Sequence, residues 1–365
     1  MKSNPPSEAP STSGMVEYDD NSRMQKNLVL SKDEVLQSLV GKMGAVDGEF
    51  VIADYGCGPG HSAVDAVKPS LAKYREISPG GSVVVRHVDQ PGNDWNGLWK
   101  IVFGPDGYQH YENVRSEAVI GSFYETQASR GSVAIATCFA ASHWSSRAIH
   151  THSPGTAWFA DLEGEARAEA KALARADWLA FMHARKEELR PGGCLMVATL
   201  GSVPDPTEIN GVKAAARKVY RAIFRVADEM AKDGLLKRSA VDRFVFPLWF
   251  PTVDDLLEPI EDDADLKDAF EILDADVKPA AVHPDDVFAD LISNPKQYGE
   301  SYTGYVRGFG ESSIRLHLIA PSADSPSEVD GLTDEYFDRF QKLYTDEPGQ
   351  HAFENLNITF LAQRK

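Results

Sequence analysis

A short apolar run followed by a glycine-rich turn constrains the fold of this chain more than any other stretch. Residues 49–53 read EFVIA and residues 54–60 read DYGCGPG. The run has the length of a buried strand, glycines let the backbone approach a ligand closely, and a following helix would present its N-terminus to that ligand. The stretch therefore predicts a strand, a ligand-binding loop and a helix.

The spacing of the glycines separates two classes of nucleotide cofactor. A dinucleotide-binding turn follows G-x-G-x-x-G, in which the third glycine lets the helix pack closely on the strand. Here the glycines are Gly56, Gly58 and Gly60, and His61 holds the position of the third dinucleotide glycine. The acid-x-G-x-G-x-G pattern that begins at Asp54 is typical of S-adenosylmethionine (SAM) methyltransferases. A plain glycine turn between strand and helix is the alternative.

Strand-like and helical patterns alternate after this unit. Apolar runs at 82–88, 133–138 and 194–200 predict buried strands, and helical patterns cover 62–75 and 161–189. The alternation predicts an α/β fold with a mostly parallel, doubly wound sheet. The second strand ends at Asp89, whose two carboxylate oxygens could accept both hydroxyls of a ribose, with a turn or capping role as the alternative.

Further helical patterns exceed what such a sheet needs. Apolar residues at Val212, Ala216, Val219, Ile223, Val226 and Met230 recur at steps of three and four, which predicts an amphipathic helix. We expect this helix, the stretch 244–260 and helical stretches near 284–291 and 302–318 to cap the carboxyl ends of the strands. The expected division is a disordered leader at 1–14, a SAM-binding core at 15–203 and 266–365, and a helical cap at 204–265 with contributions from 278–320.

Charge and cysteine content restrict the partners. The chain has 37 Lys and Arg against 55 Asp and Glu, a formal net charge of −18, which disfavours binding to nucleic acid or anionic lipid. Cys57, Cys138 and Cys194 show no paired spacing, which fits a reducing compartment. No apolar run reaches the length of a membrane span. We therefore expect a soluble, cytoplasmic protein with no nucleic-acid or membrane partner.

Seven short blocks, in order, resemble the SABATH family of carboxyl methyltransferases, named from plant salicylate, benzoate and theobromine enzymes. The blocks are Y-x-x-N-S-x-x-Q from Tyr18, D-x-G-C from Asp54, D-Q-P-G-N-D-W-N from Asp89, G-S-F-Y from Gly121, S-H-W-S from Ser142, R-x-x-E-L-x-P-G-G from Arg185 and F-x-x-P-x-W-x-P from Phe244. The C-terminal third is only generally similar. The resemblance implies a Rossmann-like class I SAM methyltransferase sheet with a mostly helical cap, SAM as methyl donor, a carboxylic acid as substrate, and a homodimer as one possible assembly.

The resemblance also implies roles for individual residues. The residues expected to bind the cofactor are Asp54, Gly56, Cys57 and Gly58 at the methionine portion, Asp89 at the ribose, Gln90, Ser122 and Phe123 at the adenine, and Tyr18 and Ser22 closing over it. Gln25 and Trp144 are expected to donate an amide and an indole N–H to the substrate carboxylate. A carboxylic acid is already ionised at neutral pH, so alignment and exclusion of water carry the catalysis, and no general base is needed.

Departures from the family pattern bear on the substrate. Ala140 replaces an aromatic residue of salicylate-type enzymes, which predicts a wider or longer pocket that suits a fatty or other aliphatic acid as well as a small aromatic acid. Phe246, Leu248, Trp249 and Phe250 are candidates for its apolar lining, and His143 is a candidate pocket wall or substrate hydrogen bond, with a packed histidine as the alternative.

No metal is expected. Some family members hold a divalent ion near D-x-F-N, but the segment starting at Asp242 reads DRFV and lacks the amide oxygen. The acidic run 261–265 and the pair His150 and His152 read as solvated or loop residues. The alternatives left open are an N- or phenol O-methyltransferase of a small heteroaromatic compound, a dinucleotide-dependent oxidoreductase and a non-catalytic SAM-binding regulator.

Overall fold

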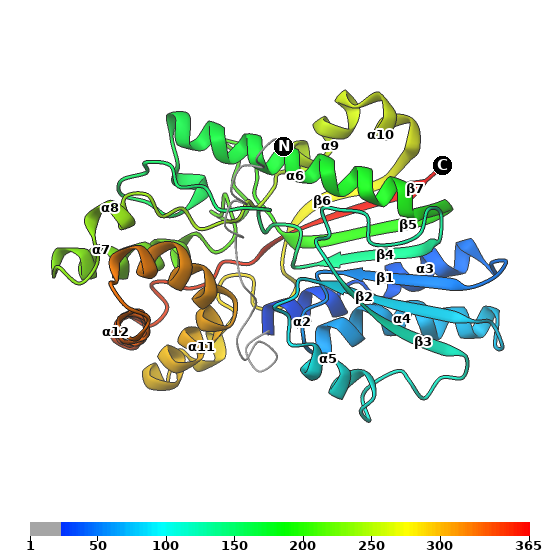
Figure 1. The fold of residues 1–365 in the computed structure, drawn as a ribbon, viewed down its shortest axis with the longest axis horizontal. Helices are drawn as coiled ribbons and strands as arrows, with labels where there is room; N and C mark the ends of the chain where they lie inside the picture. The colour runs from blue at the N-terminus through cyan, green and yellow to red at the C-terminus, as the bar shows by residue number, and fades with distance from the viewer. Residues whose placement is uncertain (1–22) are drawn as a thin grey trace, which may run out of the picture.

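The computed structural model describes residues 23–365 and has two parts, a sheet flanked by helices and a lobe of helices beside it (Figure 1). The leader expected at 1–14, and Tyr18 and Ser22, lie outside the described residues. Within the described range, no helix combines the length and the apolar character that a membrane crossing requires.

A seven-stranded sheet forms the first part, in the order β3-β2-β1-β4-β5-β7-β6. The strands are β1 (Phe50–Tyr55), β2 (Val83–Asp89), β3 (Val114–Ile120), β4 (Val133–Phe139), β5 (Leu189–Leu200), β6 (Phe270–Pro279) and β7 (Leu356–Arg364). Strands β1 to β5 pair in parallel with their neighbours, and β7 lies antiparallel between β5 and β6. The prediction of a mostly parallel α/β sheet is confirmed.

Helices cover both faces of the sheet, which explains why β1 is apolar and buried at almost every position (Figure 1). The helices are α2 (Arg23–Leu30), α3 (Asp33–Met43), α4 (His61–Ile77) and α5 (Trp95–Val102) on one face, and α6 (Gly164–Glu188), α9 (Val253–Asp262) and α10 (Ala264–Ala269) on the other. Successive β1 residues point to opposite sides, so Phe50 and Ile52 join the core under α3 and α4, whereas Val51 and Ala53 join the core under α6 and α9.

The second part, here called the cap, has an apolar core of its own that continues to the ends of the strands. Its elements are η1 (Phe159–Asp161), α7 (Arg217–Lys232), α8 (Arg238–Val241), η2 (Ala289–Leu291), α11 (Pro295–Ile314), η3 (Arg315–Ile319), η4 (Ala320–Ser322) and α12 (Pro326–Asp346). Helix α12 packs along α11 and against α7. The cap is therefore built from chain segments on both sides of α9, α10 and β6.

This composition differs from the expected boundaries. Helices α9 and α10, in or next to the range expected to form the cap, pack with α6 over the sheet. Helix α12, in the range expected to belong to the core, packs in the cap. Both displacements arise because the chain enters the cap more than once and returns to the sheet each time, which local periodicity does not report.

Two elements occupy stretches expected to lack regular structure. Residues 95–102 form α5, whose first turn is capped by Asp94, which accepts a hydrogen bond from the Gly97 amide at 2.9 Å. Residues 114–120 form the edge strand β3, in which Arg115, Ser116 and Glu117 interrupt the apolar pattern. A half-exposed edge strand has few apolar residues, so its sequence does not stand out as a strand.

Other expected helices are shorter than their patterns. Between 244 and 252 the chain is not helical, because Pro247 and Pro251 exclude a helix, and α9 begins only at Val253. Helix α7 begins at Arg217 rather than at Val212, since the residue before it has a left-handed φ of 56°. Of the stretch 284–291, only η2 is helical.

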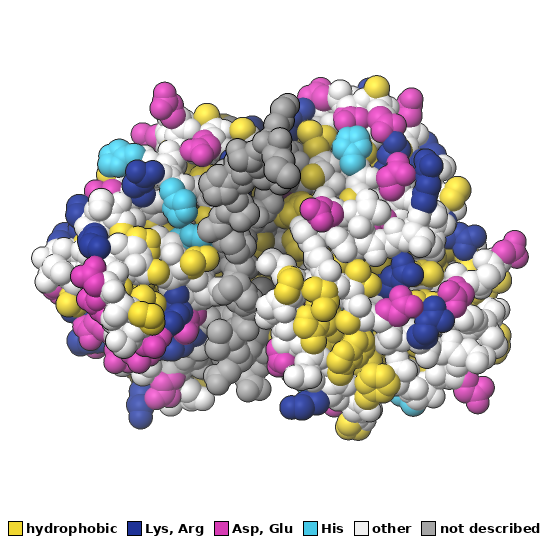
Figure 2. Space-filling model, in the orientation of Figure 1, with side chains coloured by type: hydrophobic (Ala, Val, Ile, Leu, Met, Phe, Trp, Pro, Cys, Tyr) yellow, Lys and Arg dark blue, Asp and Glu magenta, His cyan; other side chains and the backbone are white. Residues whose placement is uncertain are grey.

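Charged residues of both signs are interspersed on the face drawn in Figure 2. Blue and magenta side chains alternate over the described surface of both parts, and no broad basic patch is visible on this face.

Candidate active site

The glycine loop is fixed by its backbone and by its neighbours. Gly56 and Gly58 have φ values of 71° and 64°, a region that favours glycine. A Cβ atom at Gly56 would overlap the side chain of Ala141. The Gly58 amide donates to Asp89 Oδ2 at 2.7 Å, which ties the end of β1 to the end of β2. The loop therefore brings Asp54 and Asp89 to one edge of the sheet.

A cavity of about 790 Å³, here called the strand-end cavity, opens at this edge. Its lining includes the expected residues Asp54, Gly56, Cys57, Gly58, Asp89, Gln90 and Phe123, together with Gln25, Ala140 and Trp144. The position at the carboxyl ends of β1, β2 and β4 is where open α/β sheets bind their ligands. Residues that the sequence reasoning missed are Val29, Ser62, Ala66, Asn93, Phe139 and Ala141.

Two buried carboxyl groups give this cavity its electrostatic character. Asp54 is 3% exposed and accepts a hydrogen bond from Thr137 Oγ1 at 2.8 Å. Burial, and to a smaller extent the charge of Asp89, raise the pKa of Asp54 to about 7. Burial also raises the pKa of Asp89, although the Gly58 and Gln90 amides donate to it. A positively charged ligand would favour the ionised form of both groups, so the cavity suits a cation.

Phe123 lines the strand-end cavity, whereas Ser122 does not. Ser122 Oγ accepts from the Tyr124 amide at 3.2 Å, and the Ser122 carbonyl accepts from Gln127 Nε2 at 2.9 Å. The serine therefore shapes the loop after β3, and Phe123 presents its side chain to the cavity.

A buried ion pair holds this loop from behind. Arg185 and Glu188 are fully buried, and Arg185 Nε donates to Glu188 Oε2 at 2.7 Å. Arg185 Nη1 also donates to the Phe123 carbonyl at 2.9 Å, and the Ala128 amide donates to Glu188 at 2.9 Å. The R-x-x-E block that stood out in the sequence is thus a clamp on the segment that carries Phe123, and neither of its charged residues lines the cavity.

A second, smaller cavity adjoins the first. This aromatic cavity, of about 290 Å³, is lined by Met24, Gln25, Ala140, His143, Trp144, Leu200, Tyr220, Tyr305, Phe309 and Phe353. Gln25, Ala140 and Trp144 line both cavities, so they mark the junction. The residues from α7, α11 and the segment before β7 were not expected, because their apolar pattern equally suits a packed core.

Gln25 presents an unsatisfied amide at the junction. The side chain lies on α2 and is 6% exposed, and its Oε1 has no hydrogen-bond partner among the described residues. Leaving a buried polar group unpaired costs about 1–3 kcal/mol. Because Oε1 is an acceptor, the partner that a ligand could supply to it is a hydrogen-bond donor, whereas the Nε2–H group of the same amide is a donor.

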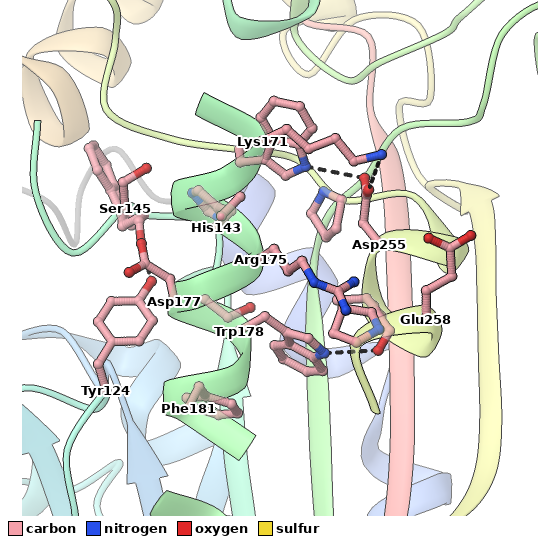
Figure 3. A pocket seen from close by; sticks show the side chains of 17 residues that line it. Tyr124, His143, Ser145, Lys171, Arg175, Asp177, Trp178, Phe181, Asp255 and Glu258 are labelled. Carbon is pink, nitrogen blue, oxygen red and sulfur yellow. Dashed lines mark hydrogen bonds and ion pairs between the residues drawn. The ribbon is translucent and has the colours of Figure 1, made fainter. Parts of the chain in front are cut away.

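The backbone around Trp144 is held by Tyr124 and Asp177, which are drawn beside Ser145 in Figure 3. The Tyr124 hydroxyl donates to the Trp144 carbonyl, and the Ser146 amide donates to Asp177 Oδ2 at 2.8 Å. The indole ring packs against Phe246, with ring centroids 5.9 Å apart. Trp144 is therefore held in position for its side chain to face both cavities.

His143 is a neutral imidazole with a defined tautomer. Burial lowers its pKa to about 3. Its Nδ1 is hydrogen-bonded to Thr199 Oγ1, and that buried hydroxyl has no other partner among the described residues. Since a buried hydroxyl proton needs an acceptor, Thr199 donates to Nδ1, and the imidazole proton resides on Nε2. His143 lines both the aromatic cavity and the pocket between α6 and α9, so its neutral Nε2–H is a candidate donor where the two adjoin.

The other residues expected in the substrate pocket lie behind it. Phe246 and Leu248 are buried and do not line either cavity; Phe246 backs Trp144, and Leu248 forms a β-bridge with it. Trp249 lines a third pocket, between α6 and α9, which shares His143 and Trp144 with the aromatic cavity, and its Nε1 donates to Asp255 at 3.2 Å (Figure 3). Phe250 packs edge-on against His143 at 5.1 Å. The F-x-x-P-x-W-x-P block therefore supports the junction.

Asp242 and the histidines considered as metal ligands have other contacts. Asp242 lies 3.5 Å from Arg238 on the preceding turn, and its carbonyl accepts from the Ser153 amide at 2.8 Å. The His150 carbonyl accepts from Arg243 at 3.1 Å. Over residues 23–365, no three His, Cys, Asp or Glu side chains are grouped so as to hold a metal ion.

Comparisons with known proteins agree with this geometry. A family model for SAM-dependent carboxyl methyltransferases matches residues 10–365. Gibberellic acid methyltransferase 2 of Arabidopsis thaliana is 25% identical over 346 residues, covering 89% of this chain and 85% of that protein. Farnesoic acid carboxyl-O-methyltransferase of the same plant is 26% identical over 262 residues, covering 67% and 72%. The solved structure of loganic acid methyltransferase with SAH has the same fold, with a TM-score of 0.71 at 19% identity and coverage of 95% and 96%.

Proposed function

This chain belongs to the SABATH family of SAM-dependent carboxyl methyltransferases, and we propose that it converts a small or medium-sized free carboxylic acid into its methyl ester. The observation that carries the proposal is the junction of two cavities at Gln25 and Trp144. One cavity has the buried carboxylates that suit a cation, and the other has apolar walls. The Gln25 side chain lies at this junction, where its Nε2–H group could donate to a carboxylate and its unpaired Oε1 could accept from a donor on the methyl donor or the acid.

The strand-end cavity fits SAM, whose sulfonium and ammonium groups are cationic. In the proposed arrangement Asp54 and the glycine loop receive the methionine portion, Asp89 accepts the ribose hydroxyls, and Phe123 offers a ring to the adenine. SAM would supply a methyl group bonded to a positively charged sulfur, which keeps the bonding electrons when the methyl group is transferred and becomes a neutral thioether. Burial of Asp54 and Asp89 strengthens their attraction to that charge, because the surroundings screen it weakly.

The acceptor carboxylate is held by neutral donors. Gln25 contributes an amide N–H, Trp144 its indole N–H and His143 its Nε2–H. Neutral hydrogen bonds orient a carboxylate oxygen while leaving its charge available for attack, which a salt bridge would reduce. The new bond joins this oxygen to the methyl carbon, the bond from that carbon to sulfur breaks, and no proton is transferred. The low pKa of His143 keeps it a hydrogen-bond donor that carries no charge.

The size of the aromatic cavity restricts which acids could fit as substrate. Its open space of about 290 Å³ is less than half of the about 790 Å³ of the strand-end cavity. The rings of Tyr220, Phe309 and Phe353 surround the space that Ala140 leaves open. This favours a small aromatic acid or a short to medium aliphatic acid over a long-chain fatty acid, although some relatives are named for larger acids such as gibberellic and farnesoic acid.

A methyl-transfer assay over a panel of free acids tests the proposal. The panel contains benzoate, salicylate, indole acetate and straight-chain acids from hexanoate to tetradecanoate, and mass spectrometry identifies each product. Methyl esters from one or more of the smaller acids are the expected result. Transfer only to a nitrogen or phenol of a test compound, with every free acid left unchanged, would overturn the carboxylate assignment.

A further inference from the structure

The hydroxyl group of Tyr220 is an unexplained polar group in the aromatic cavity. Tyr220 lies on α7 and is only 2% exposed, yet its oxygen has no hydrogen-bond partner among the described residues. Some unpaired polar atoms of the core, such as the indole nitrogen of Trp158, have almost no accessible surface. The Tyr220 oxygen is not one of these fully buried atoms, so it retains some accessible surface. Its accessible surface therefore faces the cavity that Tyr220 lines.

The ring that carries this hydroxyl is held firmly. Trp158 stacks on it with centroids 4.3 Å apart and an interplanar angle of 6°. Phe246 and Phe309 pack against it at 5.1 Å and 6.2 Å. Because the ring cannot leave its place without breaking these contacts, the hydroxyl has a fixed position in the cavity wall.

The ring of Tyr220 lies one aromatic ring away from the Trp144 indole. Phe246 contacts Tyr220 on one side and the Trp144 indole, at 5.9 Å, on the other. The described lining of the cavity thus offers polar hydrogens near the junction and one more on the α7 side, with apolar side chains such as Leu200 and Phe309 completing the wall. A plain alkyl chain or unsubstituted ring would leave the Tyr220 hydroxyl unpaired, at a cost of about 1–3 kcal/mol.

We propose that the substrate carries a neutral oxygen, as a hydroxyl, carbonyl or ether, away from its carboxylate, and that Tyr220 binds it. This inference rests on the proposed function and refines its substrate class to oxygenated monocarboxylic acids. A second carboxylate is the wrong partner, because none of the described residues lining the cavity is Lys or Arg. Burial raises the pKa of Tyr220 far above neutrality, so its hydroxyl keeps its proton.

Paired acids that differ by one oxygen test the inference. Suitable pairs are octanoate with its hydroxy and oxo derivatives near the far end of the chain, and phenylpropanoate with its para-hydroxy derivative. Initial rates give kcat/KM for each member with the wild type, Tyr220→Phe and Tyr336→Phe. Tyr336 is a matched control, since its hydroxyl also lies in the cap but donates to the Ile223 carbonyl at 2.8 Å. Calorimetry of the same acids with the SAH-loaded enzyme gives a second measurement, independent of turnover.

The wild type is expected to prefer an oxygenated member, and Tyr220→Phe is expected to lower that preference about 10- to 100-fold. Tyr336→Phe should leave the preference unchanged. The inference is overturned if Tyr220→Phe changes kcat/KM equally for both members of each pair, or if the wild type prefers the plain acid in every pair. In either case the proposed function stands. If the folded, SAM-binding wild type esterifies none of the acids, the proposed function falls, and the inference falls with it.

Discussion

Gln25 on α2 and Trp144 in the loop after β4 line the same two cavities, although more than a hundred residues separate them in the chain. The sheet edge brings them together, because the loop after β4 lies beside the glycine loop and α2 packs close to β4. Their side chains are the points at which a methyl donor and an acid would meet. Most of the predictions below concern how this meeting point is built.

Trp144→Phe should lower kcat/KM for a free acid about 10- to 100-fold, because it removes one hydrogen bond to a buried anion while keeping an aromatic ring. SAM affinity should change little, since the ring still borders the strand-end cavity. Steady-state kinetics and SAM titration check the two expectations separately. Unchanged turnover of free acids would show that the indole N–H does not hold the carboxylate.

The affinity for SAM should depend on pH through Asp54. With a pKa of about 7 in the free protein, Asp54 is mostly protonated at pH 6, and a cation must displace that proton to bind. We expect the SAM dissociation constant to rise about tenfold from pH 8 to pH 6. Asp54→Asn should bind weakly with a much flatter pH dependence, and titrations in a single buffer series would show this. If the SAM dissociation constant of the wild type changed with pH in parallel with that of Asp54→Asn, Asp54 would not be the group that controls the pH dependence of SAM binding.

The same group should make the SAM-free protein less stable as pH rises. The folded-state pKa of Asp54 is raised from 3.8 to about 7, so its stabilising contribution is complete below pH 4 and is lost as pH rises through 7. The loss amounts to roughly 4 kcal/mol at most, and Asp54→Asn should remove it. Denaturant unfolding of the wild type and Asp54→Asn at pH 5 and pH 8 measures the difference. Equal pH dependence in the two proteins would refute this expectation.

Breaking the buried clamp should weaken both folding and SAM binding. Arg185→Met leaves Glu188 buried without its partner and frees the Phe123 carbonyl, which predicts a loss of about 3–5 kcal/mol in unfolding free energy. The exposed pair Lys73 and Glu76 provides the control, since Lys73→Met should cost at most about 1 kcal/mol. Binding is compared under conditions where both variants remain folded. If Arg185→Met binds SAM as tightly as the control does, the clamp does not position the Phe123 loop.

Two glycines with similar backbone angles allow the steric effect of an added Cβ atom on SAM binding to be distinguished from its effect on backbone conformation. Gly56 has a φ of 71° and faces Ala141, whereas Gly131 has a φ of 63° and open space where a Cβ would lie. Both Gly→Ala substitutions strain the backbone, but only Gly56→Ala also displaces the loop. We expect SAM affinity to fall at least about tenfold in Gly56→Ala and to stay near wild type in Gly131→Ala. Similar SAM affinities in both variants would argue against a close-packed loop.

The sequence predicted the family, the α/β sheet and the cofactor because those features depend on local order. A strand, its glycine loop and the acid after the next strand are contiguous or nearly so, and their spacing carries the signal. Gln25 and Trp144 were named only through the family blocks, since nothing near either residue indicates that the other lies close to it; the structure brings them to one junction, and their role as donors stays a prediction.

The aromatic cavity could not be predicted in the same way. Tyr220, Phe309 and Phe353 come from three segments that meet only in the cap, and each fits an ordinary apolar core pattern. The block around Trp249 combines two positions: Leu248 pairs with the Trp144 loop, and Trp249 lines the pocket between α6 and α9, so its strong pattern alone does not say which residue borders a ligand. Tertiary contacts decide which side of a packed aromatic ring borders a cavity. Those contacts depend on how distant segments meet in the cap, and the periodicity of a single segment carries no information about that.

The choice of methyl acceptor is tested most directly by a substrate that offers two. Salicylate carries a carboxylate and a phenol on one ring, and the position of the transferred methyl group can be read from the product by NMR. If Gln25, Trp144 and His143 hold a carboxylate at the junction, the product is the methyl ester with its phenol free. A methoxybenzoate product, with its carboxyl group unmodified, would contradict the account.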